Sequence, residues 1–187
     1  MKETAKAIAR AIAIAATLVP ALLSGFGRWE PAFVFFGQFL AMTPGIPGDY
    51  LRTAYYWMTL LDCSLSSRIS FGSFFAHPQA RIGKRVYIGA YCVIGRAEIG
   101  DNTQIASAVQ ILSGASQHSR DASGQISSSE QGEFVTVKIG ADCWLGAACI
   151  VMADVGPGST VGAGSVVTRE IPLKSVATGV PARVHTA

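Results

Sequence analysis

Three histidines, His77, His118 and His185, are the side chains in this sequence best suited to acid-base or metal chemistry. A neutral imidazole can accept a proton near neutral pH, so one well-placed histidine can act as a general base. Three histidines can also bind zinc, but their nitrogens must converge to about 2.1 Å from one ion. The histidines here are widely separated, and His185 lies in the C-terminal tail. We therefore expect a general base and no metal site.

Four cysteines form the second set of reactive side chains. No Cys-x-x-Cys pair occurs, which disfavours a zinc or redox site. Cys92, Cys143 and Cys149 occupy equivalent small-residue positions in the repeat described below, and Cys63 stands alone before it. Such thiols are expected to be buried and structural, which suits a reducing compartment. A serine nucleophile is not indicated either, because the chain lacks a Gly-x-Ser-x-Gly motif.

The elements that must position these residues are visible as a repeat. Isoleucine followed by glycine returns every six residues at Ile82, Ile88 and Ile94, and the pattern continues to Val161 and Gly162. A six-residue unit fits one short strand and one corner, and three units close one triangular coil. The aliphatic residue that leads each unit stacks on its equivalent one coil away. Glycine after this lead residue is expected to permit backbone angles that a Cβ would forbid.

A second property recurs together with the aliphatic lead residue. The fourth residue after each lead residue is small or β-branched, so its side chain fits inside a tight corner. The spacing between lead residues shortens from Ile94 to Ile99 and from Val151 to Val155, which predicts altered corners. The two properties together predict an all-β fold, a parallel β-helix within residues 63–187. The small positions are Val86, Cys92, Thr103, Val109, Cys143, Cys149, Ser159 and Ser165.

One loop interrupts the repeats after Ile111, and the period resumes at Ile139. Residues 113–136 form this excursion, which is rich in Ser, Gly and Gln. A long loop on a rigid scaffold is a common place for function. It carries His118, which we predict to be the catalytic base, and Asp121, which we rank well below it as a group that orients or binds the acceptor.

Residues 1–62 lack the repeat and are predicted to be an apolar helical segment. An apolar run at 11–23 follows Lys2, Lys6 and Arg10; it is too short to span the membrane, which takes about 20 helical residues. Two more apolar segments, 33–42 and 50–61, flank a Pro- and Gly-rich turn at 43–48. The helices either cap the open first coil or lie in a membrane interface, and the sequence favours neither alone.

Composition limits the function classes. The chain has 187 residues, a net charge of +3 and a pI of about 8.8, without a clustered basic stripe or interleaved aromatic residues. These values favour one compact domain with an unusual start, and they exclude nucleic acid as an expected partner.

Residues 69–185 resemble the hexapeptide-repeat acyltransferases, which transfer acetyl from acetyl-coenzyme A to hydroxyls or amines. The resemblance rests on the repeats, the histidine-bearing excursion, the run from Cys143 to Gly146, and the ending at 161–172 and 179–184. It implies a left-handed β-helix, a homotrimer with sites between subunits, and acetyl-coenzyme A as co-substrate with no metal. The cytosolic co-substrate favours a cytoplasmic protein, on the cytoplasmic face of the membrane if the helices are interfacial, over a secreted one with a signal peptide.

The resemblance also assigns roles by position. His118 matches the catalytic histidine, and Trp144 matches a tryptophan that helps wall the acceptor site. The remaining matches concern the cofactor. Two small residues and a threonine match positions that line the pantetheine arm. Two arginines match basic residues near the nucleotide phosphates, with which guanidinium groups pair well. These cofactor residues are Ala147, Ala163, Thr168, Arg169 and Arg183.

The acceptor is less well indicated than the donor. Galactoside-type members carry an Asn and an Asp before the loop, where this chain has Gly89 and Tyr91, which argues against a simple free sugar. The apolar start, with the run 47–52, looks more like members from capsule and exopolysaccharide assembly. We therefore expect a hydroxyl of a sugar, glycan or lipid-linked saccharide.

Three alternatives stay open at this point. N-acetylation of an amino sugar is the first, within the same enzyme class. A membrane-docked scaffold without catalysis is the second, and it would show no acetyl-coenzyme A binding. A γ-type carbonic anhydrase shares the fold but needs three converging histidines.

Overall fold

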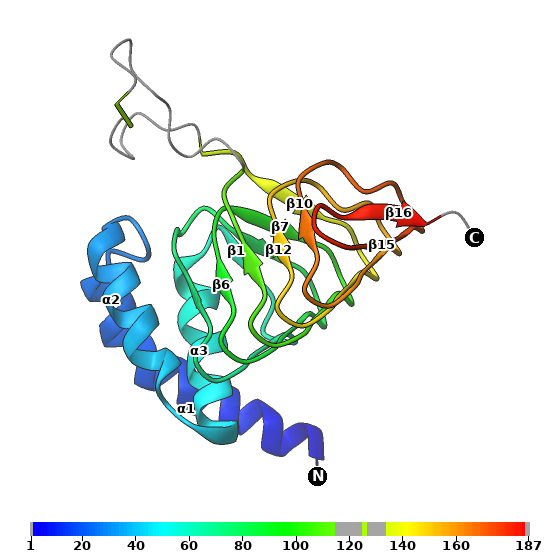
Figure 1. Ribbon diagram of the computed structural model, residues 1–187. Coiled ribbons are helices and arrows are strands. Elements are labelled where there is room, and N and C mark those ends of the chain that lie inside the picture. Colours follow the sequence, from blue (N-terminus) through cyan, green and yellow to red (C-terminus); the bar gives the residue numbers. More distant parts are fainter. Residues whose placement is uncertain (1, 115–124, 127–133, 186–187) are drawn as a thin grey trace.

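The computed structural model describes residues 2–114, 125–126 and 134–185. It shows three helices followed by a left-handed parallel β-helix of the kind the sequence predicts (Figure 1). The helices are α1 (Lys2–Leu23), α2 (Glu30–Ala41) and α3 (Gly45–Thr59), and they cover one end of the β-helix. The chain then winds away from them, and the C-terminal strands lie at the far end (Figure 1).

Three parallel sheets make the sides of the triangular coil. Sheet A holds β1 (Asp62–Cys63), β4 (Arg81–Ile82), β7 (Ala97–Ile99) and β10 (Val137–Ile139), and single bridges at Val155 and Ile171 extend it. Sheet B holds β2 (Arg68–Ile69), β5 (Tyr87–Ile88), β8 (Gln104–Ile105), β11 (Trp144–Leu145), β13 (Thr160–Val161), β15 (Val176–Thr178) and the antiparallel β16 (Arg183–His185). Sheet C holds β3 (Phe74–Phe75), β6 (Val93–Ile94), β9 (Gln110–Ile111), β12 (Ile150–Val151) and β14 (Val166–Val167).

The core consists of the predicted lead residues stacked in columns. Ile82, Ile88 and Ile94 are at most 1% exposed, and Ile88 pairs with Ile105 on the next coil. All eight predicted small positions are buried as well, which confirms the corner prediction. The narrow core therefore has aliphatic columns along its sides and small residues in its corners.

The first coil lacks the regular aliphatic lead residues of the later coils. Cys63, Ile69 and Phe75 occupy its three lead positions, and their register partners are Ile82, Ile88 and Ile94. The prediction that Cys63 stands outside the repeats is therefore wrong. The six-residue spacing is present in these residues, but cysteine and phenylalanine replace the aliphatic residue that reveals it elsewhere.

The glycines after the lead residues have a different cause from the one predicted. Left-handed backbone instead occurs three residues after many lead residues, as at Arg85, Asn102 and Ala148. The glycine itself lies where the next coil passes closely, since a Cβ on Gly146 would stand 2.4 Å from the Ala163 nitrogen. Glycine is needed there because stacked strands are only about 4.8 Å apart.

Replacing Gly146 with alanine should therefore destabilise the β-helix by about 1–3 kcal/mol, the usual range for overpacking. Gly164→Ala is the matched control, because a Cβ there meets no atom within 4 Å and only the φ of +67° is unfavourable. That backbone strain costs about 1–2 kcal/mol. Denaturant unfolding of both variants measures the difference, and a milder effect at Gly146 than at Gly164 would contradict the close-approach explanation.

Helix α3 covers the open edge of the first coil through buried polar side chains. Arg52 is fully buried; its Nε donates to the Ile69 carbonyl at 2.9 Å, and its Nη2 donates to Asp49 Oδ1 at 2.7 Å. Its Nη1 donates to the Thr43 carbonyl at 2.7 Å, next to the C-terminal end of α2. The Phe75 backbone amide donates to the Tyr56 hydroxyl at 3.2 Å. Edge groups that lack a preceding coil thus find partners on the helices.

The helix bounds differ from the predicted segments at two places. Helix α3 begins at Gly45, inside the predicted turn, so the break between α2 and α3 is shorter than expected. Helix α1 continues through Arg10 and Lys6 toward Lys2, and by length and composition it is the one helix in the described part of the chain that could cross a membrane. The prediction that this segment is too short to span is therefore wrong.

The four cysteines are free and buried, which confirms their predicted structural role. Burial raises the pKa of the Cys63 and Cys149 thiols to about 12 and also raises the pKa of Cys92 and Cys143. A thiol with a raised pKa holds little thiolate at neutral pH, so none of the four is a suitable nucleophile.

Candidate active site

Nearly every departure from the six-residue period lies on one edge of the β-helix, where sheet C turns into sheet A. We call this the C–A edge. The chain takes seven residues from Phe75 to Ile82, five from Ile94 to Ile99, and four from Val151 to Val155. The long excursion between Ile111 and Ile139 leaves from the same edge. Because strand positions are held by the stacked core, variation collects at this edge, as expected for a functional surface.

The two ends of the excursion form a closed neck, which we define as residues 113–114 and 134–136. The Val135 amide donates to the Ser113 carbonyl at 3.0 Å, so the outgoing and returning chains lie together. Ser113 is 1% exposed, and its hydroxyl accepts the Arg96 amide at 2.8 Å. The excursion therefore rises from a fixed position between the third and fourth coils.

An aromatic contact ties the neck to earlier corners of the same edge. The Phe134 ring centroid lies 5.1 Å from that of His77, and the Arg96 guanidinium lies over Phe134 at 5.1 Å. His77 Nδ1 lies 2.5 Å from Glu30 Oε1 at the start of α2. A chain of contacts thus links the helices to the base of the excursion.

The first two predicted cofactor residues meet at the corners that join sheet B to sheet C, which we call the B–C edge. Ala147 and Ala163 are both exposed there on consecutive coils. The Gly164 amide donates to the Ala147 carbonyl at 2.8 Å, so the two corners stack directly. Small side chains in this column leave the edge open to a narrow ligand.

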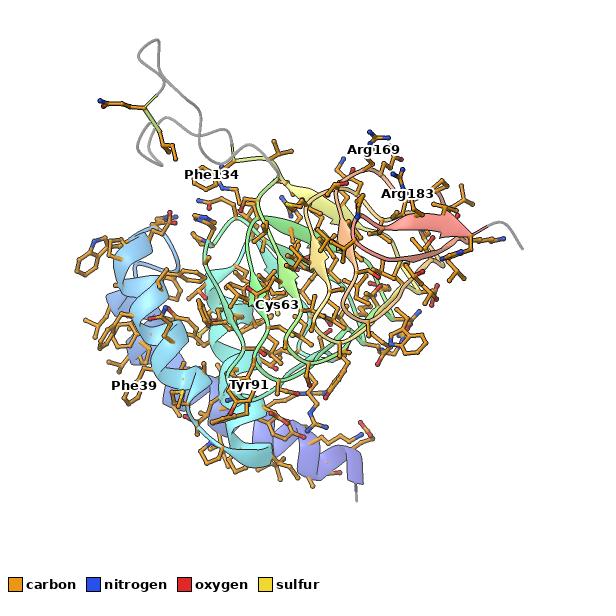
Figure 2. All side chains as sticks on the ribbon, in the orientation of Figure 1. Phe39, Cys63, Tyr91, Phe134, Arg169 and Arg183 are labelled. Atoms are coloured by element: carbon orange, nitrogen blue, oxygen red, sulfur yellow. The ribbon has the colours of Figure 1, made fainter. Side chains whose placement is uncertain are left out.

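The other three predicted cofactor residues belong to the last coils. Thr168 and Arg169 are exposed on the C–A edge after β14, while Arg183 begins β16 opposite Thr178. Figure 2 shows Arg169 and Arg183 at the end of the β-helix farthest from the helices, with Phe134 toward the same upper side. Both guanidinium groups project from exposed positions, where they are accessible to an anion.

Trp144 lies apart from Thr168 and Arg169. It is 58% exposed on the outer face of sheet B, between Gln104 and Thr160 on the neighbouring coils. In a triangular coil the face of sheet B is opposite the C–A edge. One copy of the chain therefore does not bring Trp144 together with Thr168 and Arg169.

His118 and Asp121 lie outside the described residues, so the structure gives their attachment point and not their placement. Sequence reasoning missed the His77, Arg96 and Phe134 cluster that holds this attachment point. Counting residues between successive lead residues could have found it, because the count places His77 and Arg96 on the edge from which the excursion leaves.

Two family models match the β-helix. Residues 79–113 match the bacterial transferase hexapeptide of six repeats, and residues 136–169 match the hexapeptide repeat of succinyl-transferase. The serine acetyltransferase of Bacillus subtilis is 34% identical over 111 residues, which cover 58% of this chain and 46% of that protein. The chain spans about half the length of the first curated relatives it matches.

Solved structures share the fold. A maltose O-acetyltransferase from Clostridium difficile has a TM-score of 0.63 at 24% identity, covering 85% of this chain and 88% of that one. A polySia-specific acetyltransferase has a TM-score of 0.52 at 26% identity, covering 65% and 58%. An N-acyltransferase from Bacillus cereus, solved with dTDP-4-amino-4,6-dideoxyglucose and coenzyme A, has a TM-score of 0.54 at 22% identity, covering 65% and 69%.

Proposed function

Because the chain belongs to the hexapeptide-repeat acyltransferase family, we propose that it transfers an acetyl group from acetyl-coenzyme A to a hydroxyl of a sugar, glycan or lipid-linked saccharide. The observation that carries the proposal is the neck on the C–A edge. It attaches the His118-bearing excursion to a rigid corner column, and Thr168 and Arg169 lie farther along the same edge. An excursion that carries a base and leaves from the same edge as Arg169 suits transfer from an anionic cofactor.

The proposed chemistry has a single transfer step. Neutral His118 takes the proton of the acceptor hydroxyl while its oxygen attacks the thioester carbon. The tetrahedral intermediate then collapses, its C–S bond breaks, and coenzyme A leaves as the thiol with a proton. An acetyl-enzyme is not invoked, because the cysteine thiols are buried and have raised pKa values.

The separation of the site residues supports a homotrimer. Ala147 and Ala163 lie on the B–C edge, whereas Thr168 and Arg169 lie on the C–A edge of the coil that contains Ala163. When the B–C edge of one copy faces the C–A edge of the next, Trp144 and the excursion can border one groove. Three such contacts close a ring, so every copy completes a neighbour's site.

The saccharide acceptor is supported by the kind of proteins that share the fold. Similar structures include a maltose O-acetyltransferase and a polySia-specific acetyltransferase, and a third was solved with an amino-sugar nucleotide. The experiment is a screen of nucleotide sugars, glycans and lipid-linked saccharides with acetyl-coenzyme A, read by mass spectrometry. We expect a product heavier by one acetyl group and labile to mild base, as an ester is. A base-stable product would indicate an amide and overturn hydroxyl acetylation.

Arg183→Ala should raise the KM for acetyl-coenzyme A and leave turnover nearly unchanged. A phosphate contact far from the reacting carbon binds the ground and transition states alike. Loss of one charge-assisted contact corresponds to about 1.5–3 kcal/mol. Lys174→Ala is the control, because Lys174 is exposed on the same terminal coil outside the proposed site. Equal KM values for wild type and Arg183→Ala would remove Arg183 from the cofactor site.

A further inference from the structure

Helix α1 has its apolar side toward solvent. Ile8, Ile12, Val19 and Leu23 are 57%, 64%, 61% and 56% exposed. Their spacing places them on one face of the helix, since residues four, seven and eleven apart lie close to the same line. The exposed aliphatic face therefore extends from Ile8 to Leu23, the last residue of the helix.

The opposite face of α1 carries small and polar residues and is the packed one. Ala13, Thr17 and Ala21 are at most 3% exposed, and α1 lies against α3 along this side. A helix at a water-facing surface normally buries its large apolar residues and exposes its polar ones. The reversed arrangement in α1 is the one expected where the surrounding medium is itself apolar.

Helix α2 and its connection to α1 also expose large apolar side chains. Phe35 and Phe39 on α2 and Met42 directly after it are 62–68% exposed, and Phe26 and Trp29 in the connection are 46% and 61% exposed. Figure 2 shows Phe39 pointing away from the coils. Exposed apolar side chains gathered over two helices mark an interaction surface, and scattered ones do not.

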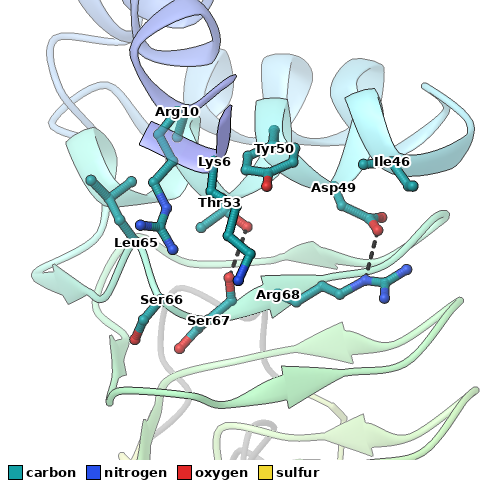
Figure 3. A pocket seen from close by; sticks show the side chains of 11 residues that line it. Lys6, Arg10, Ile46, Asp49, Tyr50, Thr53, Leu65, Ser66, Ser67 and Arg68 are labelled. Atoms are coloured by element: carbon teal, nitrogen blue, oxygen red, sulfur yellow. Dashed lines mark hydrogen bonds and ion pairs between the residues drawn. The ribbon is translucent and has the colours of Figure 1, made fainter. Parts of the chain in front are cut away.

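A basic cavity lies beside the polar face of α1. It has a volume of about 300 Å³ between α1, α3 and the first coil, and Figure 3 shows Lys6 and Arg10 directed from α1 toward Ser66 and Ser67. Arg10 Nε is buried and has no hydrogen-bond partner among the described residues. Phosphate oxygens are suitable acceptors for such a group.

The acidic groups near the cavity leave Arg10 available. Asp49 is 2.7 Å from both Arg68 Nε and Arg52 Nη2, so its carboxylate is already paired. Glu3 pairs with Lys6 Nζ at 2.8 Å on the exposed surface. Tyr50 also lines the cavity. The cavity wall therefore has an excess of positive charge.

We propose that the helical layer docks on an anionic lipid surface, with the exposed apolar face of α1 and α2 in the lipid and the Lys6–Arg10 cavity holding a headgroup phosphate. Because α1 packs along α3, and Arg52 ties α3 to the first coil, α1 lies in the interface without leaving the fold. An interfacial helix sinks about 5–10 Å, and its diameter is about 10 Å, so its polar face reaches headgroup level. This docking is independent of the proposed acetyl transfer, since binding alone tests it.

The first arm of the test concerns the apolar face. Co-sedimentation with vesicles of phosphatidylcholine containing phosphatidylglycerol should show binding of the full chain, and Ile12→Glu with Val19→Glu should weaken it by about ten-fold or more. Leu173→Glu is the matched control, because Leu173 is also 64% exposed but lies on the last coil. Thermal melting shows that each variant is folded. Wild-type vesicle binding by the double variant, or an equal loss in Leu173→Glu, overturns the proposal.

The second arm concerns the cavity. Arg10→Gln should remove most of the preference for phosphatidylglycerol vesicles over pure phosphatidylcholine vesicles, whereas Lys174→Gln, which removes the same charge from the last coil, should keep it. An unchanged preference in Arg10→Gln overturns the headgroup assignment. If the apolar variants instead convert an assembled wild type to single chains and do not alter vesicle binding, the face joins copies of the chain and the lipid proposal is wrong.

Discussion

Replacing His118 with alanine or asparagine is expected to lower turnover by about 10²- to 10⁴-fold, the usual contribution of a general base. The excursion leaves the stacked core at a closed neck, so the free energy of unfolding should change by no more than about 0.5 kcal/mol, as for a surface substitution. Acetyl-coenzyme A should still bind, because its expected contacts are on the later coils. Steady-state kinetics on the identified acceptor and a calorimetric titration measure the two quantities.

Gln117→Ala is the control for this prediction, since it changes the neighbouring residue without removing a titratable group. Its turnover should stay close to that of the wild type. A His118 variant with wild-type turnover would leave the proposed mechanism without a base. Loss of cofactor binding together with turnover would indicate that His118 shapes the site and does not transfer the proton.

Replacing Arg52 with methionine is expected to destabilise the protein by about 3–5 kcal/mol, the usual result of breaking a buried ion pair by removing one partner. The Asp49 carboxylate would lose its buried partner, and the carbonyls of Ile69 and Thr43 would lose their donor. Tyr56 and the apolar contacts of α3 would remain. Denaturant unfolding followed by far-ultraviolet circular dichroism measures the change.

Arg68→Met is the matched control, because Arg68 also contacts Asp49 at 2.7 Å but its side chain is 58% exposed. Only Asp49 is buried in this pair, and its carboxylate keeps Arg52 as a partner, so Arg68→Met should lose clearly less stability than Arg52→Met. Similar stabilities for the two variants would show that Arg52 does not hold the helices on the first coil.

The sequence predicted the β-helix because the lead residues and the small corner residues repeat locally. The predicted domain starts at residue 63, but Cys63 and Phe75 were not recognised as lead residues because the pattern has aliphatic residues there, although their stacking on Ile82 and Ile94 is the same. The role of Arg52 could not be read, since its partners at Thr43 and Ile69 come together only after folding. Local periodicity was thus sufficient to predict the coils, whereas contacts between distant segments could not be predicted.

The candidate site shows the same division. Ala147 and Ala163 could be placed on one edge by counting corners, and the structure stacks them. The contact of Phe134 with His77 could not be found this way, because the second and third coils separate the two residues along the chain. Trp144 was assigned to the acceptor site by resemblance, and only the folded coil shows that it faces away from the C–A edge of its own copy.

Calorimetric titration of the full chain with acetyl-coenzyme A is the decisive test of the proposed acetyl transfer, because it needs no knowledge of the acceptor. We expect saturable binding of one cofactor per chain, weakened in Arg183→Ala and retained in His118→Ala. Absence of acetyl-coenzyme A binding by the folded wild-type protein would contradict an acetyltransferase and leave the β-helix as a scaffold.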